Sequence, residues 1–277
     1  MKSLFYLLLF SLFCYIPVSL LAQKEKYTKS IGVYFEIRSD TTNSKRYTED
    51  NEIYKANYIF HYSIEYFDFN GIQKYYKYLN YSPILSERWD FVSKSDSVVI
   101  EYRMKVLPDL DIFDRRNKDY DQSVIQYTFW QADGKEQPVS EKTGLVENKK
   151  NIWLHPPRTD LTTILQLNPF PCVRLPMKVG RIWRGYLKIG SGWGDERWIT
   201  WEGKITNKFK YRISGKCTIE TELGVLKCYI VKSVAKSTLG KTYLTSYFNS
   251  HYGFVRYEYI NIDGSQILIN LKKVDVK

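Results

Sequence analysis

Apolar and polar residues alternate with a period of two along much of the chain. The clearest run is 125–130, where Ile125, Tyr127 and Phe129 alternate with polar or amphipathic residues. The same spacing recurs in segments 31–38, 100–105, 255–259 and 267–271. Successive side chains of a strand point to opposite faces, so this pattern predicts antiparallel strands with one apolar and one solvated face.

Turn residues separate these runs. Asp133-Gly134 and Asp263-Gly264 are each expected to close a hairpin, because both residue types tolerate positive φ. Gly190–Gly194 predicts another turn, since a phosphate-binding loop would need a helix after it and a strand pattern follows. One short helix is expected over Thr159–Leu167, with Pro169 ending it.

The predicted fold is mostly β: an antiparallel curved sheet, as a sandwich or an open barrel, with at most one short helix. The 24 Tyr, 14 Phe and 7 Trp residues favour strands. An N-terminal β region (23–150) and a C-terminal β region (151–277) meet near a polar break. We expect one continuous sheet system across them, because each half alone would leave uncovered edges.

The first 22 residues predict an export signal. Lys2 precedes an uncharged apolar run, and Ala22 stands before a polar residue as a cleavage point. The alternative is a membrane anchor, against which Pro17 interrupts the run. We therefore expect a periplasmic or secreted location for the mature chain.

The charge is basic, at +11 over the whole chain. Basic residues are spread along the sequence without a block of five, so no nucleic-acid partner is predicted. Attraction to an anionic envelope surface is one interpretation, and a merely solubilising charge is the other.

Three cysteines follow the signal: Cys172, Cys217 and Cys228. The last two flank the tip of a predicted hairpin. If Thr221 pairs with Gly224, the two cysteines lie opposite each other and form one face with apolar residues. A cross-strand disulfide and two buried thiols both remain open in that register. A bulge at the turn would instead point them to opposite faces.

Metal and catalytic motifs are weak. His61, His155 and His251 have no second ligand at a metal-binding spacing, and no Gly-x-Ser-x-Gly sequence occurs. The acid-rich stretch 109–121 has no glycine bend or closing Glu for calcium. We predict no catalytic residue, no metal and no cofactor.

The best binding candidate combines tryptophans with charged groups. Flat aromatic faces beside carboxylates suit sugar rings, whereas the alternative is that the tryptophans are core residues. The candidate ligand-binding residues are Trp183, Trp193, Asp195, Glu196, Arg197, Trp198 and Trp201.

The C-terminal half, roughly 155–273, resembles a family of uncharacterised exported bacterial domains of unknown function. The stretches that carry this resemblance are Asn168–Pro171 with Val179–Trp183, Thr221–Gly224 with Cys228-Tyr229, Ser237–Gly240 with Tyr247–Asn249, and Tyr252–Arg256 with the Asp263-Gly264 hairpin. The resemblance implies an exported β-rich fold and supplies no catalytic residue.

The predicted function is an exported, non-enzymatic protein of the cell envelope with a binding or structural role and an unknown ligand. A glycan- or lipid-binding carrier is the first alternative, because a curved sheet can hold such a ligand on its concave face. A glycan hydrolase using Asp195 or Glu196 is the second.

Overall fold

A computed structural model describes residues 28–30, 33–35, 51–80, 88–108 and 122–276. The predicted export signal, the acid-rich stretch 109–121 and part of the predicted strand 31–38 lie outside the described residues. No helix in the part of the chain that the structure describes is long and apolar enough to cross a membrane.

Strands dominate the structure. The strands are β1 (Thr28–Ser30), β2 (Val33–Phe35), β3 (Ile59–Phe67), β4 (Gln73–Asn80), β5 (Arg88–Val92), β6 (Val99–Val106), β7 (Ser123–Gln131), β8 (Glu136–Glu147), β9 (Asn151–Leu154), β10 (Cys172–Arg174), β11 (Ile182–Gly190), β12 (Lys204–Thr221), β13 (Gly224–Lys236), β14 (Lys241–Asn249), β15 (Gly253–Ile260) and β16 (Gln266–Asp275). Two 3-10 segments, η1 (Asp160–Leu167) and η2 (Ser191–Trp193), interrupt them.

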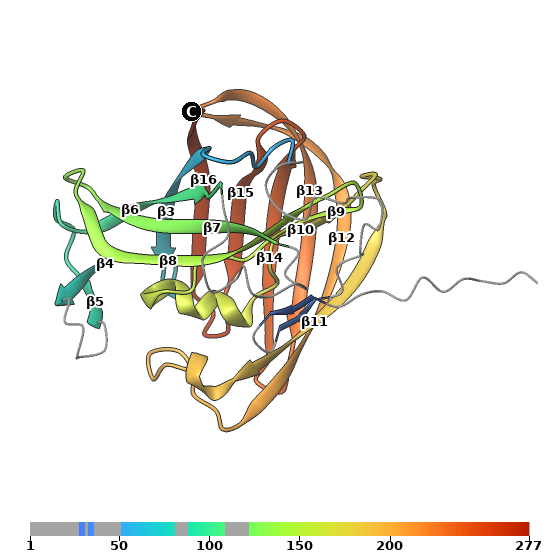
Figure 1. The fold of residues 1–277 in the computed structure, drawn as a ribbon. Helices are drawn as coiled ribbons and strands as arrows, with labels where there is room; N and C mark the ends of the chain where they lie inside the picture. Colours follow the sequence, from blue (N-terminus) through green and yellow to red (C-terminus); the bar gives the residue numbers. More distant parts are fainter. Residues whose placement is uncertain (1–27, 31–32, 36–50, 81–87, 109–121, 277) are drawn as a thin grey trace, which may run out of the picture.

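Twelve of the described strands form one antiparallel path in the order β10-β9-β8-β7-β6-β3-β16-β15-β14-β13-β12-β11. The β4–β5 hairpin branches from β3. The sheet curves until its two end strands, β10 and β11, approach closure (Figure 1). This confirms the predicted mostly β, antiparallel curved sheet. Strand β3 pairs with both β6 and β16, so strands from both sequence regions share the sheet.

Aromatic side chains fill the inside of this sheet. Tyr62, Tyr127 and Tyr211 are fully buried, and each hydroxyl donates a hydrogen bond to a backbone carbonyl at 2.7–3.1 Å. A buried hydroxyl without a partner costs free energy, so these bonds allow tyrosine to serve as a core residue.

The predicted short helix is confirmed and takes the 3-10 form. Thr159 caps η1, and nearly all of its residues are buried. At its end the carbonyl of Leu167 accepts hydrogen bonds from Asn207 and Thr242, both at 2.7 Å. These contacts fasten η1 to β12 and β14, so the helix closes part of the space inside the curved sheet.

Segment 100–105 was predicted to place Ile100, Tyr102 and Met104 on one apolar face, and this prediction is wrong for Ile100. Tyr102 and Met104 are buried, whereas Ile100 is 40% exposed. The pairing of β6 with β7 shifts between Val99 and Glu101, and this irregularity releases Ile100 from the core face.

Glycine at position 253 is required by both conformation and space. Its φ is +74°, and an added Cβ would lie 2.2 Å from the Tyr54 hydroxyl, which accepts a hydrogen bond from Phe254 N–H. We expect Gly253→Ala to lower the free energy of unfolding by roughly 2–4 kcal/mol. Gly134→Ala, at φ +80° with open space around it, should cost only about 1 kcal/mol. Urea unfolding measures both; equal losses would contradict the packing argument.

Candidate functional site

The loop between β11 and β12 packs against the β4–β5 hairpin. Trp198 stacks on Trp89 of β5, with ring centres 6.1 Å apart and planes 20° apart. The Arg197 guanidinium carbon lies 3.7 Å from the centre of a Trp89 ring, and its Nη1 donates to the Trp89 carbonyl at 2.8 Å. Two of the predicted binding residues, Arg197 and Trp198, therefore contact another part of the chain.

Asp195 is held by the same arginine. Its carboxylate accepts hydrogen bonds from Arg197 Nε at 2.8 Å, Nη2 at 2.6 Å and the backbone N–H at 2.9 Å. These hydrogen bonds from Arg197 lower the pKa of Asp195, against a smaller effect of burial. The group is thus a carboxylate at neutral pH, which makes it a poor proton donor.

A second acid–arginine pair lies near Trp193. The Arg158 guanidinium is 5.7 Å from a Trp193 ring centre, and its Nε lies 3.6 Å from Glu141 Oε2. Glu141 also accepts a hydrogen bond from the Arg158 backbone. Burial raises the pKa of Glu141 to about 7, although hydrogen bonding and the charge of Arg158 act in the opposite direction.

The remaining predicted residues occupy different environments. Trp183 is buried on β11 and stacks on Tyr211 at 5.3 Å, with the planes 3° apart. Trp201 is half-buried beside Gly194, whereas Glu196 is exposed. The structure brings Asp195, Arg197 and Trp198 together and places Trp183 in the core.

Three residues of this region were missed from sequence: Trp89, Glu141 and Arg158. They lie far from residues 193–201 in the chain, so spacing could not connect them. Trp89 alternates with Phe91 in a weak strand pattern, which is the one signal available for it. Trp89 therefore joins the candidate ligand-binding residues, because Arg197 and Trp198 both contact its ring. Glycan binding by these tryptophans stays a prediction.

The histidines are engaged in structural contacts. His61 Nδ1 lies 3.2 Å from Glu101 and Nε2 lies 2.9 Å from Asp275, so both ring nitrogens have partners. Burial lowers the pKa of His155 to about 3, and its Nδ1 lies 2.7 Å from the Pro156 carbonyl. Among the described residues, no cluster of three His, Cys, Asp or Glu side chains is arranged to hold a metal.

The β12–β13 hairpin has the register that places its cysteines together. Thr221 pairs with Gly224 and Cys217 with Cys228, as the apolar face predicted. Both cysteines are thiols in the structure. Burial raises the pKa of both, that of Cys228 to about 11. The disulfide itself remains a prediction.

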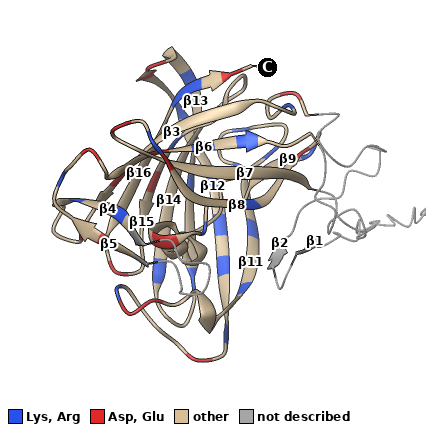
Figure 2. Ribbon diagram, turned by 60° about the vertical axis from the view of Figure 1, so that its left-hand side comes forward, with Lys and Arg blue, Asp and Glu red and all other residues tan. Residues whose placement is uncertain are grey.

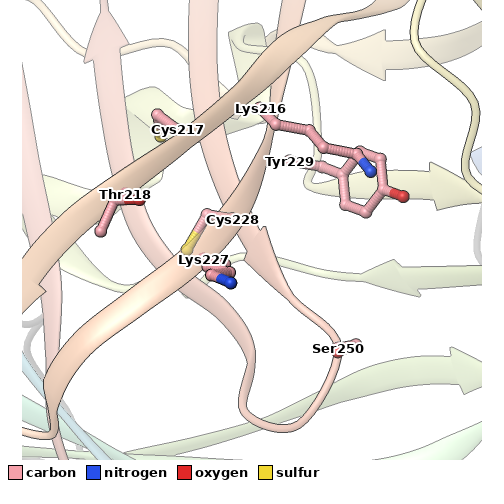
Figure 3. Close-up of a pocket in the computed structure, with 7 residues that line it drawn as sticks. All are labelled: Lys216, Cys217, Thr218, Lys227, Cys228, Tyr229 and Ser250. Carbon is pink, nitrogen blue, oxygen red and sulfur yellow. The ribbon is translucent and has the colours of Figure 1, made fainter.

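The same hairpin borders a cavity of about 350 Å³. Lys216 extends over the Tyr229 ring, with its ammonium 4.6 Å from the ring centre (Figure 3). The lining residues are Lys216, Cys217, Thr218, Lys227, Cys228, Tyr229 and Ser250. Two ammonium groups and three hydroxyls suit an anion better than a cation.

No family model and no curated protein sequence matches the chain. Among solved structures, the fold is similar to a protein described as exported, with a YmcC-like fold, from Bacteroides fragilis, at 14% identity and TM-score 0.44, covering 81% of this chain and 98% of that one. It is also similar to a protein described as a lipoprotein from Parabacteroides distasonis, at 10% identity and TM-score 0.44, covering 80% and 97%. A third is the hypothetical lipoprotein YmcC from Escherichia coli, at 10% identity and TM-score 0.33, covering 81% and 90%.

These descriptions coincide with the predicted export of this chain. Family membership and location are predictions from the sequence.

The buried Glu141 predicts a pH dependence of stability. Its pKa in the fold, about 7, lies above the ordinary value of 4.5, so the folded state retains a proton that the unfolded state loses. This group's contribution to stability therefore falls as pH rises from about 4.5 to 7, by at most roughly 3 kcal/mol.

Glu141→Gln removes this titration. Its stability relative to wild type should improve by about 2–3 kcal/mol between pH 5 and pH 8 in urea unfolding. Glu136→Gln, on the exposed part of the same strand, is the control and should show no such trend. A parallel pH profile for wild type and Glu141→Gln would contradict the argument.

The cysteine register predicts a thiol count. In protein recovered from an oxidising compartment, denatured without reductant, we expect one reactive thiol, Cys172, which is buried in β10. Cys172→Ser should then show none, and Cys217→Ser should show two. Three reactive thiols in the wild type would exclude the Cys217–Cys228 bond.

Proposed function

We propose that the protein is an exported, non-enzymatic module of the cell envelope with a binding or structural role. The observation that carries this proposal is the arrangement around Trp89. Arg197 and Trp198 cover its ring, and Arg197 also neutralises Asp195. These are the side chains best suited to bind or cleave a sugar. In the structure they instead hold the β11–β12 loop against β5.

The packing of the core favours a function at the outer surface of the sheet over a carrier that holds its ligand inside the sheet. Tyr62, Tyr257 and Phe129, which face the inside of the curved sheet, are at most 2% exposed. Tyr62 lies 5.1 Å from Tyr102 and 5.9 Å from Tyr257, ring centre to ring centre. Side chains thus occupy the concave face that a lipid or glycan would need. Lipid that co-purifies in stoichiometric amount would favour the carrier alternative instead.

The hydrolase alternative has less support. Glycoside hydrolysis uses two carboxyl groups on either side of the scissile bond, one of them able to give a proton. Asp195 is paired with Arg197, and its pKa is lowered rather than raised. Its neighbour Glu196 is exposed.

Substitutions at the two acids separate these functions. Asp195→Asn breaks a bidentate pair and should lower the free energy of unfolding by about 1 kcal/mol. Glu196→Gln is the matched control and should change it by less than about 0.5 kcal/mol. We expect neither the wild type nor either variant to cleave any glycan in a panel of envelope glycans. Glycan cleavage abolished by Glu196→Gln would overturn the proposal.

The location is tested on the full chain carrying a C-terminal tag. Fractionation should place the mature protein with the periplasm, envelope or medium, and its N-terminal peptide should begin at Gln23. Recovery of the intact chain from the cytosol would contradict the proposed export.

A further inference from the structure

Strands β11–β14 form a strongly basic wall. Two Lys or Arg residues lie in β11, five in β12, three in β13 and one in β14, whereas Glu220 is the only acid within these strands. Along the sequence these residues alternate with others and form no block. The sheet sets the four strands side by side, and basic segments appear along β11 and β12 in Figure 2.

Basic side chains in this wall face one another directly. The opposed pairs are Arg184–Lys210, Arg212–Lys232, Lys208–Lys236 and Lys236–Lys241. All of these side chains are exposed, as is Lys204. None of them forms an ion pair with a carboxylate of the described residues. Like charges opposite each other destabilise a sheet, so the arrangement costs stability that an anionic partner would restore.

We propose that this cationic wall binds an acidic polysaccharide. The wall comprises Arg184, Lys204, Lys208, Lys210, Arg212, Lys232, Lys236 and Lys241. Neighbouring strands lie about 4.8 Å apart, so cations in one row across the strands repeat at about the length of a sugar ring. Consecutive carboxylates of a polymer can therefore meet consecutive ammonium or guanidinium groups.

The shape of the wall favours a flexible polymer over a bilayer. Residues that alternate with the cations, such as Phe209 and Tyr211, are buried in the core, so the cations lie on the convex side of the curved sheet. A flexible chain can follow that curvature, whereas a flat membrane touches only a strip. Interfacial binding also needs a continuous apolar face that inserts into the lipid. The large exposed apolar residues of β11–β14 are Ile182, Val225 and Tyr243, which lie on three different strands.

Polygalacturonate is the probe for the test, with neutral dextran as the uncharged polymer. The mature protein should bind polygalacturonate at low salt and lose affinity steeply as salt rises. Lys208→Gln/Lys210→Gln/Arg212→Gln should weaken binding at least about tenfold and reduce the slope of log affinity against log salt by about 2–3. Its melting temperature should not fall, because the substitutions relieve repulsion.

The matched control is Lys55→Gln/Lys94→Gln/Lys149→Gln, which removes three exposed cations outside β11–β14. It should bind within about twofold of wild type, since the wall is intact. Equal weakening of both triple variants would overturn the proposal, because net charge alone would then explain binding. Binding to phosphatidylglycerol vesicles without binding to polygalacturonate would overturn the proposal in favour of a lipid surface. Equal binding to dextran and polygalacturonate would also overturn it, because the charge of the polymer would then play no part.

Discussion

The structure depends on burying aromatic rings, many of them tyrosines, inside one curved sheet while the hydroxyls of Tyr62, Tyr127 and Tyr211 keep hydrogen bonds to backbone carbonyls. Tyr62 and Tyr127 reach backbone carbonyls of Phe254 and His155, far away in the sequence. Each such bond fixes a strand relative to a loop or to another strand. The core thus specifies the curvature of the sheet by geometry as well as by apolar area, because a flatter sheet would separate these donors from their acceptors.

The same alternation that builds the core also determines the outer surface. When Phe209 and Tyr211 point inward, Lys208, Lys210 and Arg212 must point outward. Antiparallel pairing then sets those cations beside the cations of β11 and β13. Along the sequence the positive charges are spread out, yet the register sets those of β11–β14 side by side on one wall. The core and the cationic wall are therefore two faces of the same strands.

Local signals made much of the fold predictable. The Asp-Gly turns have positive φ at Gly134 and Gly264, and the short helix lies within one residue of its predicted start. The coherent apolar face predicted the pairing of Cys217 with Cys228. Ile100 was misplaced because a bulge depends on the partner strand. Trp89 was missed because only tertiary contact brings β5 to the β11–β12 loop.

The candidate site shows why residue type alone does not predict binding. A tryptophan, an arginine and a carboxylate suit a sugar, but they equally suit one another. In the fold, Arg197 stacks on Trp89, donates to its carbonyl and pairs with Asp195. A sugar at the tryptophan cluster would have to displace the contacts among Arg197, Trp89 and Asp195. An anion at the cationic wall would meet Lys and Arg side chains that form no ion pair with a carboxylate of the described residues. We therefore expect an anion to bind the convex wall more favourably than a sugar binds the tryptophan cluster.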